Sequence, residues 1–292
     1  MAAALFYLIS SVVEYIGAIC LLTLTTLASG SSGNCLLVSC GATHLLVDVG
    51  ISARRITRSL RELGLEPDQL SGVLITHEHT DHIAGLATLS RQYDFPVYAS
   101  HGTGRQLCYR LAALEDRLRP FEPGVSFPVG DLEVASFPTL HDTPYSVGYS
   151  LTDGRHRAAV VTDLGLVTQD VLEGISGCHL LVAESNHDED WVRSGPYPYP
   201  LKQRILGDHG HLSNEAGGQL VCSAVAAGAV QVVLAHLSSE NNTPARAYGT
   251  VSAALEGAGA VVGADLTLAV APRSEIGPTY RVGQPALAPT PS

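Results

Sequence analysis

Three histidines and two acidic residues stand within six consecutive positions of the run Thr76-His77-Glu78-His79-Thr80-Asp81-His82. Imidazole nitrogens and carboxylate oxygens together suit zinc and similar divalent transition metals. His77 and His79 alternate along an extended segment, so their side chains can point the same way. Asp81 and His82 are adjacent, which disfavours both joining that pair at one ion. Two metal ions that share one loop are therefore the simplest prediction.

Further residues of ligand type follow most of the apolar segments downstream, where these segments end. Polar side chains that recur along one edge of a sheet are a common way to build a site. The positions are His141-Asp142, Asp163, Glu184-Ser185-Asn186-His187-Asp188, Gly210-His211-Leu212-Ser213-Asn214 and His236. Each is an ordinary polar residue when taken singly, and only the joint pattern indicates a site.

The composition indicates a folded chain with a sizeable core. Of its 292 residues, 46% are hydrophobic and 15% are charged, which is atypical of disorder. The formal net charge of −11 argues against a surface that binds nucleic acid through charge alone. A nucleic-acid substrate stays open, because bound metal ions can supply the positive charge in a site.

The cysteines and the N-terminus bear on localisation. The six cysteines are scattered without a C-x-x-C pair, which predicts free thiols in a reducing, cytoplasmic compartment. Residues 1–22 are largely apolar and near the length of a membrane span. Glu14 lies within them and no Lys or Arg precedes Arg54, so a signal peptide is not predicted and a membrane anchor is the minority alternative. A misplaced start or a hydrophobic appendage explains the segment at least as well.

Predicted strands and helices alternate in two similar series, which suggests two sheets covered by helices. The strands are expected at 22–27, 35–39, 44–48, 72–76, 97–99, 132–137, 145–151, 157–161, 179–184, 230–234 and 266–271. The helices are expected at 53–64, 83–93, 104–118, 167–172, 213–227 and 243–255. Residues 191–210 are expected to be a long irregular segment with Tyr197, Tyr199, Lys202 and Arg204. The segment either shapes the substrate entrance, by stacking a base and pairing with phosphate, or packs as a covered loop on the sandwich. We predict an apolar extension over 1–21, one domain over 22–272 and a flexible Pro/Ala-rich tail over 273–292.

The metal-ligand pattern resembles that of the metallo-β-lactamase superfamily, over residues 22 to about 271. The pattern comprises His77-x-His79-x-Asp81-His82, His141, Asp163 and His236. The resemblance implies an α/β fold, an αββα sandwich of two mixed sheets flanked by helices, with a dinuclear site at the sheet edges. It implies two divalent ions per chain, Zn²⁺ or Mn²⁺. One ion would be held by His77, His79 and His141, the other by Asp81, His82 and His236, with Asp163 as the bridge.

Three segments narrow the resemblance to one branch of that superfamily. Ser29-Gly30-Ser31-Ser32-Gly33-Asn34, the segment from Glu184 and the segment from Gly210 are similar to the YycJ (WalJ, VicX) branch, described as DNA-exonuclease-like. Glu184 and His211 also resemble the Glu and His pair that ribonuclease Z-type phosphodiesterases use beside their metals. A carboxylate at Asp163, where some members have cysteine, favours the phosphodiesterase branches over β-lactamases.

The resemblance implies a dinuclear phosphodiesterase, with a DNA exonuclease favoured, in which a hydroxide between two metals attacks phosphorus. Asp81 would orient that water or accept its proton. His211, held by Glu184, would stabilise the phosphate or protonate the leaving oxygen. Asp142 is the expected partner of a ligand imidazole. The expected substrate contacts are Ser31, Ser32, Asn34, Asn186 and Lys202.

Two alternative functions stay open at this point. One is hydrolysis of a small ester, thioester or cyclic phosphate, and the other is a metal-binding regulatory protein without turnover. The complete ligand set and the pair of Glu184 and His211 favour catalysis. Because the chain is acidic, we expect catalysis to depend on metal and local contacts more than on a broad basic track. A homo-oligomer also stays open.

Overall fold

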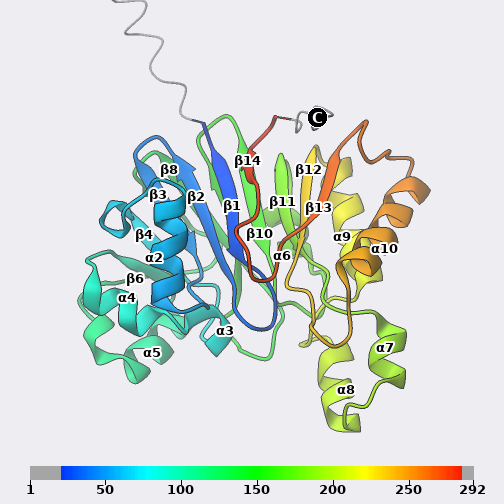
Figure 1. The fold of residues 1–292 in the computed structure, drawn as a ribbon, viewed down its shortest axis with the longest axis horizontal. Helices are drawn as coiled ribbons and strands as arrows, with labels where there is room; N and C mark the ends of the chain where they lie inside the picture. Colours follow the sequence, from blue (N-terminus) through cyan, green and yellow to red (C-terminus); the bar gives the residue numbers. More distant parts are fainter. Residues whose placement is uncertain (1–20, 285–292) are drawn as a thin grey trace, which may run out of the picture.

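The computed structural model describes residues 21–284 and places two seven-stranded β-sheets face to face between layers of helices (Figure 1). The first sheet has the order β14-β1-β2-β3-β4-β5-β6. Its strands are β1 (Thr23–Ala28), β2 (Cys35–Cys40), β3 (Thr43–Val47), β4 (Gly72–Leu74), β5 (Val97–Ser100), β6 (Leu118–Phe121) and β14 (Thr279–Arg281). The strands from β3 to β6 pair in parallel, and the others pair antiparallel. The helices that follow these strands are α2 (Ala53–Glu62), α3 (Thr80–Ile83), α4 (Leu86–Gln92) and α5 (His101–Arg110).

The second sheet has the order β13-β12-β11-β10-β9-β8-β7. Its strands are β7 (Ser126–Val129), β8 (Leu132–Pro138), β9 (Val147–Thr152), β10 (Arg157–Val161), β11 (Leu180–Glu184), β12 (Gln231–Ala235) and β13 (Thr267–Val270). The strands from β10 to β13 are parallel, and β7 to β10 are antiparallel. Its helices are α6 (Gln169–Ile175), α7 (Glu189–Ser194), α8 (Tyr199–Leu206), α9 (Asn214–Ala226) and α10 (Pro244–Gly257). Two mixed sheets flanked by helices confirm the predicted αββα sandwich.

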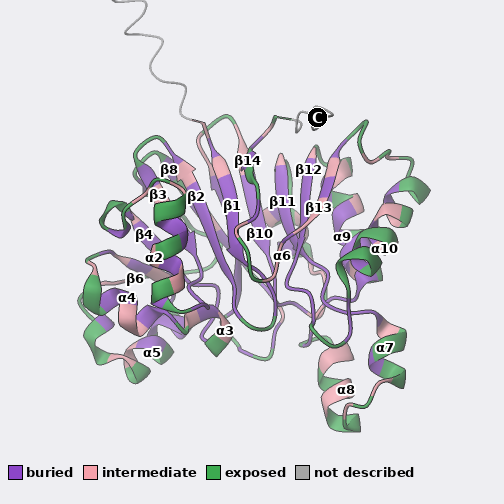
Figure 2. Cartoon of the chain, viewed as in Figure 1, coloured by how far each residue is buried: buried purple, intermediate pink, exposed green. Residues whose placement is uncertain are grey.

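The central strands are buried on both faces, which Figure 2 shows as purple arrows between greener helices, whereas the edge strands β6, β7 and β14 carry exposed residues. One core cluster fills the space between the sheets and includes Leu45 and Tyr149. Two further clusters lie under the helices, around Ile56 on the first sheet and Val251 on the second. Burial on both faces explains why several strands are continuous apolar runs in the sequence. Each fully buried aliphatic side chain contributes about 1.5–3 kcal/mol relative to its exposed state.

Several predicted helices have different limits in the structure. The helix expected at 83–93 is α4, which begins later, at Leu86, while the short helix α3 precedes it and Gly85 lies between them. A Cβ on Gly85 would lie 2.4 Å from the carbonyl oxygen of Ile51, so the backbones approach too closely there for any other residue. The helix expected at 104–118 begins earlier, at His101, because the Ser100 side chain accepts a hydrogen bond from the N–H of Thr103. It ends at Arg110, and β6 follows.

The segment expected to be irregular and the expected flexible tail also differ. Residues 191–210 contain most of α7 and all of α8, and Asp188 caps α7 by accepting from the N–H of Trp191. The prediction of a flexible tail is wrong for β14, because its backbone pairs with Thr23–Thr25 at the edge of the first sheet. The prediction of free thiols holds for Cys35, Cys108, Cys178 and Cys222 but is wrong for Cys40, which is disulfide-bonded.

The predictions for the N-terminal extension and its alternative membrane anchor fall on residues 1–20, outside the described residues. Between residues 21 and 284, no helix has both the length and the apolar character needed to cross a membrane. The domain limits and the compartment stay predictions.

Candidate metal centre

The loop after β4 carries its histidines to the edge where both sheets end. The imidazoles of His77 and His82 are fully buried there. The loop is held by Asp48, which follows β3. The Oδ1 atom of Asp48 accepts the N–H of Thr76 at 2.9 Å, and its Oδ2 atom lies 2.7 Å from Nδ1 of His82. This leaves Nε2 of His82 facing the other predicted metal ligands, which together form a cluster of side chains.

Among the described residues the cluster contains four overlapping groups of potential ligands, and in each group the ligand atoms lie within 4.8 Å of one another. Two of the four join Asp163 to other members, in one case to His77 and His82 and in the other to Glu184, His211 and His236. The remaining two share no residue with each other. The first group is His77, His79 and His141, and the second is Asp81, His82 and His236. Asp163 lies between them. Its Oδ2 atom is 3.2 Å from Nε2 of His82, and its Oδ1 atom is 3.8 Å from Nε2 of His141. The structure thus brings together the two sets, and the shared carboxylate, that the sequence resemblance implies.

The donor set fits a divalent metal ion. The Nε2 atom of His77 is buried without a hydrogen-bond partner among the described residues. The Oδ2 atom of Asp163 also makes no hydrogen bond of normal geometry there, although His82 is close. Buried polar atoms without partners are costly, and a cation is the partner that both atoms lack. Imidazole nitrogens with carboxylate oxygens are ligands that Zn²⁺ and Mn²⁺ accept.

Three residues of the site have a left-handed backbone conformation. The φ angles are 59° for Asp48, 59° for Asp163 and 57° for His236, and these are the non-glycine residues with positive φ between residues 21 and 284. Such conformations cost about 1–3 kcal/mol each and cluster at functional sites. Each of the three lies within two residues of a strand end, where the sharp turn brings its side chain into the cluster.

A buried carboxylate ties a further histidine to the second group. The Oε1 atom of Glu184 accepts from Nδ1 of His211 at 2.9 Å and from Nδ1 of His236 at 2.8 Å. Its Oε2 atom accepts the N–H groups of Leu164 and Leu212 at 3.2 and 3.1 Å. Burial acts to raise the pKa of Glu184, but the imidazoles of His211 and His236 lower this pKa to about 2. Glu184 is therefore a fixed anionic acceptor.

The pKa values of the histidines differ between the two groups. Burial lowers the pKa of His77 well below its ordinary value, and it also lowers the pKa of His141. Burial acts on His236 in the same direction, yet Asp163, Asp81 and Glu184 outweigh it and raise the pKa of His236 to about 10. The second group thus has a strongly negative environment, which favours a bound cation.

Comparisons with known proteins bear on the family. Residues 43–237 match the family model described as "Beta-lactamase superfamily domain". The chain is 38% identical over 240 residues to "Exodeoxyribonuclease YycJ" of Bacillus anthracis, which covers 82% of this chain and 91% of that protein. It is 36% identical over 242 residues to "Exodeoxyribonuclease WalJ" of Streptococcus pneumoniae (strain D39), covering 82% and 90%. The chain belongs to the metallo-β-lactamase superfamily.

Solved structures agree on the metallo-β-lactamase fold. YhfI from Bacillus subtilis has a TM-score of 0.66 at 17% identity and covers 89% of this chain and 99% of its own. Zn²⁺-bound PqqB from Methylobacterium extorquens has a TM-score of 0.64 at 20% identity, covering 88% and 99%. At these identities the likeness shows the fold alone. With the exonuclease relatives, family membership makes the protein a metal-dependent hydrolase.

The loop of residues 29–34 is hydrogen-bonded to the loop that carries residues 77–82. The N–H of Asn34 donates to the carbonyl oxygen of Asp81 at 2.8 Å, and the N–H of Gly50 donates to Asn34 O at 2.8 Å. A Cβ on Gly50 would lie 1.6 Å from Asp81 O, so only glycine fits there. The Asn34 side chain is buried and its Nδ2 lies 3.2 Å from Nε2 of His82, whereas Ser31 and Ser32 are exposed.

The remaining predicted substrate contacts lie in two places. Asn186 is buried, and its Nδ2 donates to the carbonyl oxygen of His236 at 2.8 Å. Lys202 lies on α8, where its Nζ donates to the carbonyl oxygen of Arg193 at 2.7 Å. Asn34 and Asn186 thus hold the cluster in place, and contact of any of these residues with substrate stays a prediction.

Asp48 is a site residue that the sequence reasoning missed, and the contact of Arg204 with Asp142 was also not predicted. Asp48 follows a strand just as Asp163 does, so the same signal of a carboxylate at a strand end would have found it. Arg204 reaches from α8 to Asp142, whose Oδ2 accepts from Nε of Arg204 at 2.7 Å. The Oδ1 atom of Asp142 lies 3.2 Å from Nε2 of both His79 and His141. Because Nδ1 of His141 is already bound to the carbonyl oxygen of Gly210, Nε2 is the nitrogen of His141 left for a metal, so the partner role expected for Asp142 fits His79 and not His141.

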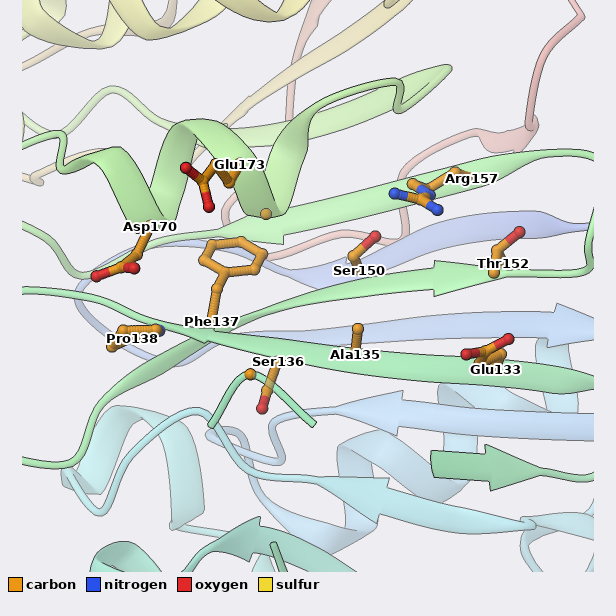
Figure 3. Close-up of a pocket in the computed structure, with 12 residues that line it drawn as sticks. Glu133, Ala135, Ser136, Phe137, Pro138, Ser150, Thr152, Arg157, Asp170 and Glu173 are labelled. Carbon is orange, nitrogen blue, oxygen red and sulfur yellow. The ribbon is translucent and has the colours of Figure 1, made fainter. Parts of the chain in front are cut away.

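A separate hollow lies on the outer face of the second sheet (Figure 3). It has a volume of about 310 Å³, and its lining includes Phe137, Ser150, Arg157 and Glu173. None of its lining residues belongs to either ligand group. This hollow is therefore not part of the metal centre.

Proposed function

We propose that the protein is a dinuclear metal-dependent phosphodiesterase that releases nucleotides from the ends of nucleic acid, with DNA as the favoured substrate. The observation that carries the proposal is the pair of ligand groups around Asp163, with His211 held beside them by Glu184. The names of the two exodeoxyribonuclease relatives support the choice of substrate. Zn²⁺ and Mn²⁺ are the two candidate ions.

When bound, the two divalent ions supply an activated water and positive charge beside the phosphate. Asp81 is placed to act on that water. Its side chain is 27% exposed, and its Oδ2 lies 3.5 Å from Nε2 of His236 and 3.6 Å from Nε2 of His82. It therefore reaches the open side of the cluster, where its carboxylate orients the water and accepts its proton.

His211 is our candidate for the group that acts on the leaving oxygen. Its Nδ1 is bound to Glu184, and 23% of its side chain is exposed. Nε2 makes no hydrogen bond to the part of the protein between residues 21 and 284, so it is available to a phosphate oxygen. From that position Nε2 donates a hydrogen bond to the phosphate or a proton to the leaving oxygen.

A substrate panel on the metal-reconstituted protein tests the proposal. The panel comprises end-labelled single- and double-stranded DNA, single-stranded RNA and bis-p-nitrophenyl phosphate, each with Zn²⁺ or Mn²⁺. We expect mononucleotides to appear from DNA faster than from RNA. Hydrolysis of the small diester without release of nucleotides from either polymer would contradict a nuclease.

A histidine variant tests the assigned roles. We expect His211→Asn to lower kcat by about 10²–10⁴-fold, the usual contribution of a positioned acid, with the metal content per chain unchanged. His101→Asn, at an exposed histidine on α5, is the matched control and should retain wild-type kcat. Loss of metal in His211→Asn would instead make His211 a ligand.

A further inference from the structure

The segment between β11 and α9 forms a projecting arm built from α7 and α8 (Figure 1). The helix α8 contains no buried residue, and its Tyr199 is 70% exposed. Isolated helices this short are marginal in water, and most helices gain their stability by burying an apolar face. One face of α8 is thus presented to solvent instead of to the core.

A groove of about 730 Å³ runs along that face of the arm. Its lining residues are Arg193, Tyr197, Tyr199, Lys202, Gln203 and Leu206. Tyr199, Lys202, Gln203 and Leu206 are spaced three or four residues apart, so they share one side of the helix. The groove therefore combines two phenol rings with two cationic side chains in a chain of net charge −11.

The charge in this groove is incompletely neutralised. Lys202 is the only lysine of the chain, and its Nζ is bound to the carbonyl oxygen of Arg193 at 2.7 Å. It has no carboxylate partner in the part of the chain that the structure describes. The Arg193 guanidinium pairs with Glu189 on the exposed surface of α7, and exposed pairs of this kind are weak.

The opposite side of α8 connects the arm to the metal centre. Arg204 pairs with Asp142, which lies 3.2 Å from Nε2 of His79 and of His141. An α-helix with its side chains is about 10–12 Å across. The groove therefore lies across α8 from the first ligand group, more than one helix width away.

Two other hollows fit a polyanion less well. The groove beside α2 is lined by Arg54, Arg58 and Arg61, but two of these arginines already pair with Glu62 and Glu66, at 2.6 and 2.9 Å. The hollow of Figure 3 has one arginine, Arg157, against three acidic residues, which would repel phosphate. Of these three hollows, the groove of the arm is the one that joins two aromatic rings and two cations to a link with the metal centre.

We infer that the groove of the α7–α8 arm binds an unpaired nucleotide of the strand whose end occupies the metal centre. In this arrangement Tyr199 stacks on the base, and Lys202 contacts the phosphate. The inference rests on the proposed function, since it names the part of the substrate that lies beyond the scissile bond. Stacking requires an unpaired base, so single-stranded ends should be preferred over blunt ones.

The first test compares KM values of arm variants, each assayed with the metal ions with which it is purified. For a single-stranded deoxythymidine oligonucleotide of about 12 residues, we expect Tyr199→Leu to raise KM about tenfold, the effect of one lost stacking contact. Lys202→Gln should raise KM by about threefold to tenfold and make binding less dependent on salt. For both variants the loss on the oligonucleotide should exceed the loss on bis-p-nitrophenyl phosphate.

The matched controls lie on the other side of the molecule. Tyr109→Leu replaces a tyrosine on α5 that is 89% exposed, and Arg58→Gln replaces an exposed arginine on α2. Both should leave KM for the oligonucleotide at the wild-type value. Equal KM values in wild type, Tyr199→Leu and Lys202→Gln would overturn the inference while leaving the proposed hydrolysis intact.

A binding measurement separates failure of the inference from failure of the proposed function. Because the chain has one lysine, acetylation of Lys202 followed by mass spectrometry reports on this groove. A phosphorothioate single strand should slow this acetylation, even if no strand is cleaved. Unchanged acetylation would contradict the groove as a binding site.

Sedimentation tests a different occupant of the groove. If Tyr199→Leu dissociates a dimer and leaves KM unchanged, the groove is a contact between copies of the chain and the inference fails.

Discussion

The two groups of potential ligands lie on either side of Asp163, but the partners of their side chains differ. In the second group the side chains of His82 and His236 are buried, with 0% and 2% exposed. Their Nδ1 atoms are bound by two buried carboxylates, Asp48 and Glu184, at 2.7 and 2.8 Å. Every rotation of these imidazoles breaks a buried hydrogen bond, so this group is rigid before any metal arrives.

We call the first group the open group because its ligand His79 rests on exposed partners. Its other ligands, His77 and His141, are as buried as the histidines of the second group, and Asp81 of the second group is itself 27% exposed. His79 is 32% exposed, and its carboxylate neighbour Asp142 is 23% exposed. Asp142 is held in turn by Arg204, which is 61% exposed and belongs to the projecting helix α8. The comparison indicates that the histidines of the second group rest on buried carboxylates, whereas His79 of the first group rests on an exposed pair that belongs in part to the arm.

Asp163→Asn should have the largest effect, because it removes the charge that both groups share. We expect kcat to fall about 10³-fold or more, since loss of a mere partner of a ligand already costs about 10–100-fold. Metal content per chain after dialysis and kcat are the measurements. Asp170→Asn, at an exposed aspartate on α6, is the control. A variant that keeps both ions would remove Asp163 from the bridging position.

The next largest effect should be a difference between the two groups in how their metal affinity depends on pH. In the metal-free protein the pKa of His236 is about 10, so at pH 7 a metal ion must displace its proton. Affinity for the second ion should therefore rise with pH, about tenfold per unit for each proton displaced. The lowered pKa values of His77 and His141 leave these imidazoles neutral at pH 7, so the affinity for the first ion should change little.

Calorimetry of Zn²⁺ binding checks this difference. Titrations between about pH 7 and 8.5, in buffers of different ionisation enthalpy, give the protons released by each ion. Equal proton release by both ions would mean that the two environments are electrostatically alike.

Asp48→Asn should weaken the second group selectively. The amide keeps the shape of the side chain but loses the charge that faces Nδ1 of His82. We expect affinity for the second ion to fall by about 10–100-fold, while affinity for the first ion stays near wild type. Metal titration of the variant, with Asp68→Asn at an exposed position as control, gives both values. An equal loss at both ions would show that Asp48 supports the whole loop and not one group.

The parts of the site that could be predicted are those encoded locally. His77, His79, Asp81 and His82 share one short run, so their residue types alone predicted metal binding. Asp163 and His236 were predicted only through the joint pattern and the family resemblance. The αββα arrangement followed from the family resemblance and is confirmed.

The parts that were missed depend on contacts between distant segments. Arg204 and Asp142 are 62 positions apart, and nothing in either local sequence indicates that they meet. The strand β14 has little local strand signal and forms because its backbone completes the edge beside β1. Likewise, α8 buries no residue, so it lacks the apolar stripe by which a helix is recognised in a sequence.

The smallest effect should come from the link between the arm and the open group. Since Arg204 is mostly exposed, its pair with Asp142 is worth little in isolation, and Arg204→Gln should change affinity for the first ion by less than about fivefold. Asp142→Asn should act in the same range, and the double variant should be no worse than the stronger single one if the two act as a pair. Metal titration of the two single variants and the double variant, at low and high salt, gives the double-mutant cycle. A loss of about 10–100-fold in Arg204→Gln, as expected for Asp48→Asn, would mean that the open group is as rigidly supported as the buried one, and that the arm is part of the metal centre.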